Sequence, residues 1–295
     1  MIPNIFLLMR PNQWSKNIFV FLPMFFGRHL TDLSCWWPNI CAFLAFCFAS
    51  SGIYCLNDIY DAESDSHHPK KCRRPLACGS VSRKQAYYTM IVCWILSFGL
   101  IFTGYQEISM KIGVASIVAL YILLNIAYCL RLKLYSVIDV FIIALGFVLR
   151  VISGGISSHV ELSHWIVLMT FLLTLFIAIA KRRDDVVVYE NSGVMLRDSI
   201  GYYNISFINM ALCIVASVTM ICYIMYTVSD EVISRIGNNY LYTTSIFVLA
   251  GLVRYLQLTI VEEKSGSPSR ILIQDHFILG CILAWSLTFT CLLYL

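Results

Sequence analysis

The sequence predicts an all-α integral membrane protein with about nine transmembrane helices. Hydrophobic residues make up 59% of the 295 residues and charged residues only 13%, a balance that ordinary soluble domains do not show. Many of the apolar stretches are long enough to cross a bilayer, so membrane lipids are expected partners. The small net charge of +4 does not indicate a nucleic-acid partner.

Nine apolar stretches account for most of the chain. The first is short and contains Pro23, so a kinked or tilted segment is expected there. The connections between stretches alternate between long polar segments and short, weakly charged ones. The stretches lie at approximately 17–30, 36–57, 85–104, 108–129, 136–156, 164–180, 206–228, 242–260 and 276–295.

The distribution of lysine and arginine predicts how these helices are oriented. Alternate connections on one side carry nearly all of the basic residues, whereas the other side carries only Arg28, Lys111 and Arg235. This bias predicts that the N-terminus lies in the cytoplasm. The two long polar loops, at 58–84 and 181–205, are expected on the same side.

The first of these loops holds the most informative residues, because it reads NDIYDAESDSHHPKKCRR from Asn57 to Arg74. Carboxylates at the mouth of a membrane helix are costly unless they hold a cation or a partner, and Mg²⁺ prefers such oxygen ligands. A metal–phosphate site is therefore predicted, the alternative being a solvated helix end. If the helix continues through this segment, Glu63 points away, and one arc of the helix carries Asn57, Asp58, Asp61 and Asp65.

The basic residues that follow predict phosphate binding. Arg73 and Arg74 offer planar, bidentate contacts, and Lys70 and Lys71 offer point charges. Pro75 breaks a helix, so residues 66–80 are expected to form a loop that folds back over the acidic residues. The alternative is that some of these cations only follow the positive-inside bias or contact anionic lipid.

A second charged cluster, KRRDD at 181–185, ends the sixth apolar stretch. On a helix Lys181 and Asp185 form an i,i+4 pair, which is typical of a salt-bridged helix end. The same cluster could instead be a second half-site that faces the first, and the sequence leaves both interpretations open. Asp139 and Arg150 lie about three turns apart within the fifth stretch, too far for a direct pair, so each needs another partner.

The acidic motif resembles a known family. NDIYDAESDSHHPKKCRRPLACG is similar to the NDxxDxxxDxxHPxKxxRPxAxG signature of the UbiA superfamily of intramembrane prenyltransferases. The opening LMRPNQWSKNIFVFLPMFFG, the stretch SVIDVFIIALGFVLRVISGGI and the KRRDD segment resemble one branch, the decaprenyl-phosphate phosphoribosyltransferases. The resemblance implies a single UbiA-like transmembrane domain over 1–295, with helices around a central cavity that cytoplasmic Asp-rich loops cap. It also implies a bacterial inner-membrane location.

The branch resemblance implies a reaction. An enzyme of this kind transfers 5-phosphoribose from 5-phosphoribosyl 1-diphosphate to a polyprenyl phosphate and releases diphosphate, with Mg²⁺ as cofactor. The nearest alternative is transfer of an isoprenoid from its diphosphate to an aromatic acceptor. A transporter is a weaker alternative, since charges concentrated at one membrane face suit surface chemistry better than a midplane site. The sequence is also compatible with a homo-oligomer.

Roles for individual residues follow from these interpretations. Asn57 and Asp61 are expected to bind Mg²⁺, and Asp58, Asp61 and Asp65 are the expected catalytic carboxylates. The substrate-binding candidates are Lys16, Lys70, Arg73, Arg74, Tyr128, Lys133, Lys181 and Arg182.

Overall fold

The computed structural model of the chain describes residues 2–66, 71–193, 198–263, 271 and 274–294, and this part of the chain contains helices and connections but no strand. Eight helical segments are long and apolar enough to cross a membrane. The all-α prediction is therefore confirmed. The segments are α3 (Leu33–Ser66), α4 (Arg83–Gly104), α5 (Ile108–Leu130), α6 (Ile138–Ser157), α7 (His164–Ser192), α8 (Ile205–Val228), η5 with α10 (Leu241–Thr244 and Ser245–Ile260), and α12 (His276–Tyr294).

The first expected apolar stretch, at 17–30, is divided between two short helices and is not one of the eight spans. Ahead of this stretch, Arg10 adopts a left-handed conformation with φ of 51° and Pro11 follows it, so the helix of the preceding residues ends there. The expected count of nine full-length helices is therefore not confirmed among the described residues. The N-terminal segment comprises α1 (Ile2–Met9), the 3₁₀ helix η1 (Pro11–Phe21) and the short α2 (Leu22–Phe26).

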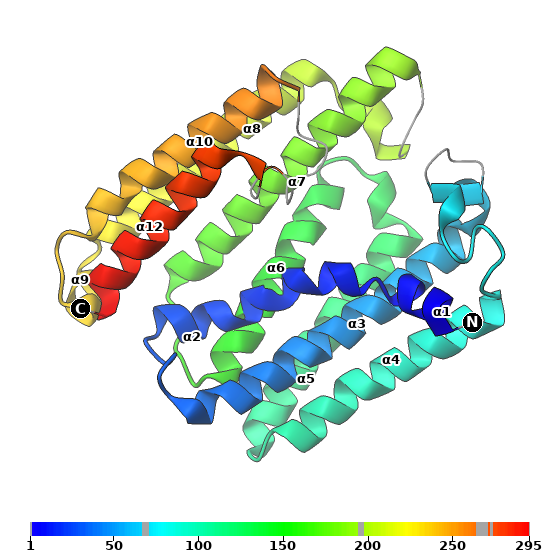
Figure 1. Cartoon of the computed structure of the whole chain (residues 1–295), viewed down its shortest axis with the longest axis horizontal. Coiled ribbons are helices and arrows are strands. Elements are labelled where there is room, and N and C mark those ends of the chain that lie inside the picture. Colours follow the sequence, from blue (N-terminus) through cyan, green and yellow to red (C-terminus); the bar gives the residue numbers. More distant parts are fainter. Residues whose placement is uncertain (1, 67–70, 194–197, 264–270, 272–273, 295) are drawn as a thin grey trace. The chain divides into compact units, whose positions relative to one another are not determined.

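The chain divides into two compact units, and the first comprises Met1–Lys133 and Gly146–Leu162. α3 is the central helix of this unit, since α1, η1, α4 and α5 all pack against it. Figure 1 shows α3 and α4 side by side. The indole of Trp94 on α4 lies where a side chain on Gly52 of α3 would project, so the glycine allows the two helices to approach closely.

The second unit comprises Leu134–Leu145 and Ser163–Leu295. In it α7 packs against α8, and α10 packs against both α8 and α12. Tyr223 joins three of its elements, because its hydroxyl is 2.6 Å from the Thr244 hydroxyl and accepts a hydrogen bond of 2.6 Å from the indole of Trp285. The division falls within α6, and the expectation of one UbiA-like domain stays a prediction.

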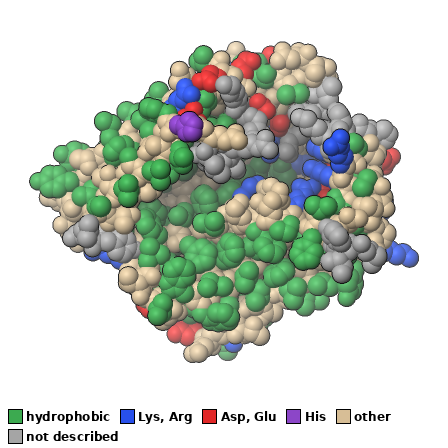
Figure 2. All heavy atoms as spheres, viewed as in Figure 1, with side chains coloured by type: hydrophobic (Ala, Val, Ile, Leu, Met, Phe, Trp, Pro, Cys, Tyr) green, Lys and Arg blue, Asp and Glu red, His purple; other side chains and the backbone are tan. Residues whose placement is uncertain are grey.

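Large apolar side chains are exposed along most of the long helices. Leu33, Ile108 and Leu287 are 83%, 74% and 67% exposed, although each belongs to an apolar helix. Figure 2 shows hydrophobic side chains over much of the face in view. Apolar surface on this scale is unfavourable in water, and long helices are one of the two structures that can cross a bilayer. The chain is therefore an integral membrane protein.

Candidate active site

The predicted acidic residues lie along the last turns of α3, because this helix continues as far as Ser66. The acidic cluster, defined here as Asn57, Asp58, Asp61 and Asp65, occupies one side of the helix as predicted. Asp58 and Asp65 are 2% and 3% exposed, and Asp61 is half-buried. Glu63 on the opposite side is exposed to solvent. The 3.6-residue period of the helix thus separates the clustered carboxylates from the solvated one.

The segment after α3 folds back over the acidic cluster, also as predicted. Arg74 donates hydrogen bonds from Nη1 to Asp65 and, over 3.3 Å, to Asp58 Oδ1. Lys71 begins the 3₁₀ turn η2 (Lys71–Arg73), and its Nζ lies 3.7 Å from Asp65 Oδ1. Two cations of this segment therefore neutralise the two buried carboxylates of the helix.

A third cation reaches the cluster from the end of α5. Lys133, in the 3₁₀ turn η3 (Leu132–Leu134), donates a hydrogen bond to Asp61 Oδ1. Asn57 donates from Nδ2 to Asp61 Oδ2 at 2.9 Å, so both oxygens of this carboxylate accept hydrogen bonds. The predicted metal-binding pair, Asn57 and Asp61, is therefore brought into direct contact.

Arg10 supplies the fourth cation, and the sequence analysis did not include it among the site residues. Its guanidinium donates to Asp58 Oδ1 and lies over the ring of Tyr54, 5.0 Å from the ring centroid. The left-handed turn at Arg10 brings its side chain from the N-terminal segment to α3. Because Arg10 and Asp58 are 48 residues apart, helical periodicity could not predict their contact.

The donor atoms of the acidic cluster fit a hard divalent cation. Asp58 Oδ2 is buried and has no hydrogen-bond partner among the described residues, which is unfavourable for a carboxylate oxygen. Asn57 and Asp61 place further amide and carboxylate oxygens on the same side of α3. Mg²⁺ is typically held by one or two carboxylates together with substrate phosphates, and this set matches that chemistry.

The remaining candidates in the first unit lie at different places. Tyr128 is half-buried and packs against the apolar core of this unit. Lys16 and Arg73 are exposed, on η1 and η2 respectively. Lys70 lies outside the described residues. The structure therefore brings Arg74 and Lys133 to the acidic cluster, whereas the substrate contacts expected of the other four stay predictions.

Comparison with known proteins identifies the family. Residues 19–279 match the model of the UbiA prenyltransferase family, which covers most of the chain. The chain belongs to this family. Its membership confirms the prediction of a membrane-bound transferase.

Two similar proteins carry the same name, decaprenyl-phosphate phosphoribosyltransferase. The one from Corynebacterium glutamicum is 28% identical over 94% of this chain and 82% of its own length. The one from Mycolicibacterium smegmatis is 29% identical over 94% of this chain and 88% of its own length. A solved UbiA homologue from Archaeoglobus fulgidus, bound to GPP and Mg²⁺, has a TM-score of 0.70 at 19% identity and covers 97% of this chain and 98% of its own. The chain therefore has the UbiA fold.

In the second unit of this UbiA family member, Arg182 is buried rather than presented to solvent. It is 1% exposed, and it donates from Nε to Asp139 Oδ2 at 2.5 Å and from Nη1 to Asp185 Oδ2 at 3.1 Å. Tyr203 adds a hydrogen bond of 3.0 Å to Asp139 Oδ1. Asp139 thus has partners other than Arg150, as predicted. Lys181 is exposed on α7, and its role and that of Arg182 in substrate binding stay predictions.

Arg150 also has partners of its own, all in the first unit. Its guanidinium donates to Asn17 Oδ1 at 2.7 Å, to the Gly146 carbonyl at 2.7 Å and to the Tyr121 hydroxyl at 3.0 Å. The faces of the Phe46 and Tyr121 rings lie 5.6 and 4.8 Å from the guanidinium carbon. This buried cation is therefore held by neutral oxygens and aromatic faces.

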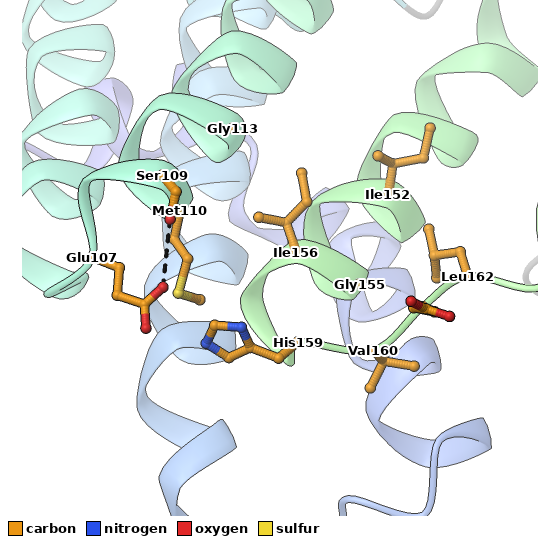
Figure 3. Close-up of a pocket in the computed structure, with 11 residues that line it drawn as sticks. Glu107, Ser109, Met110, Gly113, Ile152, Gly155, Ile156, His159, Val160 and Leu162 are labelled. Atoms are coloured by element: carbon orange, nitrogen blue, oxygen red, sulfur yellow. Dashed lines mark hydrogen bonds between the residues drawn. The ribbon is translucent and has the colours of Figure 1, made fainter.

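A pocket of about 510 Å³ lies in the first unit, but it contains none of the predicted site residues. It is formed where α5 begins and α6 ends, whereas the acidic cluster contacts the region where α5 ends. Figure 3 shows His159 pointing towards the side where Glu107 and Met110 lie, with Ile156 above it. The cluster of cations and carboxylates, rather than this pocket, is the candidate active site.

Proposed function

We propose that the chain transfers 5-phosphoribose from 5-phosphoribosyl 1-diphosphate to a polyprenyl phosphate and releases diphosphate. The observation that carries this proposal is that three carboxylates of α3 form ion pairs with four cations, which come from three other segments. Such a group can bind a divalent cation and several phosphates at once. The names of the relatives from C. glutamicum and M. smegmatis support this substrate pair.

The acidic cluster is the proposed metal site. Asn57, Asp58 and Asp61 would hold Mg²⁺, with Asp65 beside them, and Asp58 Oδ2 would gain the partner that it lacks among the described residues. When bound there, Mg²⁺ supplies positive charge that stabilises the leaving diphosphate. The A. fulgidus homologue was solved with Mg²⁺ and an isoprenyl diphosphate, which supports a metal-dependent diphosphate chemistry.

The four cations are proposed to bind the phosphates of the sugar donor. Arg10 and Arg74 have planar guanidinium groups that match phosphate oxygens bidentately, and Lys71 and Lys133 provide point charges. Positioned cations act most strongly on the charge that develops as the bond between C1 and the diphosphate oxygen breaks. Lys16, Lys70 and Arg73 remain predicted contacts to the same phosphates or to the lipid phosphate.

The acceptor needs no strong base in this proposal. A phosphate monoester has its second pKa near 6, so at neutral pH an anionic oxygen of the lipid phosphate can attack C1 directly. The new bond joins C1 to this oxygen, and the electron pair of the broken bond leaves with diphosphate. The proposed location is the cytoplasmic face of a bacterial inner membrane, where a water-soluble sugar phosphate can reach the acidic cluster.

A direct assay tests the proposal. Purified protein is incubated with Mg²⁺, polyprenyl phosphate and 5-phosphoribosyl 1-diphosphate labelled in the ribose, and the lipid phase is extracted. We expect label in the lipid, its loss when a chelator removes Mg²⁺, and its return when Mg²⁺ is restored. An unlabelled lipid phase, together with transfer from a prenyl diphosphate to an aromatic acid, would instead support the alternative activity.

A further inference from the structure

Three metal-ligating side chains come together at the other end of α3 from the acidic cluster. The imidazole Nδ1 of His29 lies 3.8 Å from Asp32 Oδ2, and the Sγ of Cys35 lies 3.6 Å from the same oxygen. All three ligand atoms lie within 4.8 Å of one another. Among the residues that the structure describes, no other set of three His, Cys, Asp or Glu side chains has its ligand atoms this close together.

The backbone holds these three residues at regular intervals. Asp32 N donates to the carbonyl of His29 at 3.1 Å, and Cys35 N donates to the carbonyl of Asp32 at 3.2 Å. Two successive turns of three residues therefore place the three side chains on one side of the connection between α2 and α3. The left-handed Arg28, with φ of 64°, precedes them and directs the chain out of α2.

The two oxygens of Asp32 have different partners. Oδ1 accepts hydrogen bonds from the Ser34 amide at 3.0 Å and the Ser34 hydroxyl at 2.6 Å, as expected of a residue at the start of a helix. Oδ2 faces His29 and Cys35 instead. Cys35 Sγ also lies 3.8 Å from the Ser158 carbonyl. Helix capping therefore accounts for Oδ1 but not for the approach of His29 Nδ1 and Cys35 Sγ to Oδ2.

We propose that His29, Asp32 and Cys35 form a zinc site. Bonds of about 2.0–2.3 Å in a tetrahedral site put neighbouring ligand atoms about 3.3–3.8 Å apart, so the two separations at Asp32 Oδ2 fit with little movement. Mixed sulfur, nitrogen and oxygen ligands suit Zn²⁺ better than Mg²⁺, which prefers oxygen alone. The thiol of Cys35 releases its proton to water on binding.

The site has an open side for entry of the ion. The side chains of His29 and Asp32 are 42% and 46% exposed, whereas Cys35 is 7% exposed and anchors the site beneath them. Three protein ligands leave a fourth position, which water would occupy. Because Cys35 and Asp58 are 23 residues apart on α3, the zinc site lies about 35 Å from the acidic cluster along the helix. It is therefore separate from the proposed transferase chemistry.

Metal retention by the full-length protein tests the site. The protein is purified in detergent with excess Mg²⁺, which fills oxygen sites, then equilibrated with Zn²⁺, desalted and analysed for metal. We expect a single zinc per chain, and an affinity weakened at least about tenfold in His29→Gln and in Cys35→Ser. Unchanged zinc affinity in both variants would overturn the proposal, as would a wild-type protein that retains no zinc beside Mg²⁺.

Co²⁺ provides a second readout that does not depend on activity. A thiolate-to-cobalt absorption band is expected in the wild type and should disappear in Cys35→Ser. The matched control is Cys41→Ser, which removes another buried thiol of α3 that lies outside the cluster and should leave the band intact. Because His29 is half-exposed, His29→Gln keeps the test decisive even where Cys35→Ser folds poorly. A band that survives in Cys35→Ser, or vanishes in Cys41→Ser, would assign the metal to other thiols.

Discussion

Lys133 and Asp61 form an ion pair between the end of α5 and the last turns of α3, although 72 residues separate them in the sequence. Each side chain is about one quarter exposed, so the pair remains reachable by solvent and by a charged substrate. The pair joins a predicted metal ligand to a predicted phosphate ligand. This contact makes the two roles parts of one site.

Asp61→Ala is expected to abolish phosphoribosyl transfer without unfolding the protein. The substitution removes a proposed metal ligand and leaves Lys133 without its partner, so we expect a loss of about 100-fold or more in the lipid-labelling assay. Glu63→Ala is the matched control, because Glu63 lies on the opposite, exposed side of the same helix. Size-exclusion elution and circular dichroism check the fold. Full turnover by a correctly folded Asp61→Ala protein would contradict the metal role.

Arg74→Ala is expected to weaken both stability and substrate binding. Arg74 bridges two buried carboxylates, and its removal leaves Asp58 and Asp65 with one cation each. Since Arg74 is 25% exposed, we expect a loss of about 1–2 kcal/mol in the free energy of unfolding, measured in mixed micelles. KM for the sugar donor should also rise. Arg83→Ala, an exposed arginine at the start of α4, should change neither quantity, and an Arg74→Ala protein that matches it would argue against the bridge.

The pair of Arg182 and Asp139 is expected to behave as a structural unit. Both residues are 1% exposed, so Arg182→Met alone leaves a buried carboxylate without its strongest partner and should cost about 3–5 kcal/mol. The double variant Arg182→Met with Asp139→Asn should lose less than the sum of the two single variants. Unfolding in mixed micelles measures the difference. Additive losses would show that the contact contributes no coupling energy.

Cysteine labelling is expected to reveal the orientation of the acidic cluster. Cys78 is exposed in the segment between η2 and α4. A membrane-impermeant maleimide should label it in inverted membrane vesicles and not in intact cells, because the charge bias predicts a cytoplasmic loop. Cys78→Ser is the control that identifies the labelled residue. Labelling in intact cells would reverse the predicted orientation.

Local features of the site could be predicted from the sequence. The side of α3 that carries Asp58, Asp61 and Asp65 depends only on helical period, and the exposure of Glu63 agrees with it. The contact of Arg74 with the end of α3 agrees with the prediction that Pro75 ends the helix and that a loop folds back over the acidic residues. Such predictions succeed because neighbouring residues determine the geometry.

Features that depend on distant contacts could not be predicted in the same way. The partner of Asp139 is 43 residues further along the chain, so the sequence indicated that a partner was needed without identifying Arg182. The left-handed turn at Arg10 interrupts the N-terminal segment, whereas hydropathy depends only on composition. The side chain of this same residue contacts Asp58, so the site contains a cation that the sequence analysis had not assigned to it.

The two charged residues of α6 differ in when their partners are synthesised. Arg150 contacts Asn17 and Tyr121, which the ribosome adds before it, whereas Asp139 contacts Arg182 and Tyr203, which are added after it. When α6 has just been synthesised, the partners of Arg150 are therefore already present, whereas those of Asp139 are not. Because an unpartnered ionisable group is costly in the bilayer, we expect Asp139 to become buried only after α7 and the segment that follows it have been translated.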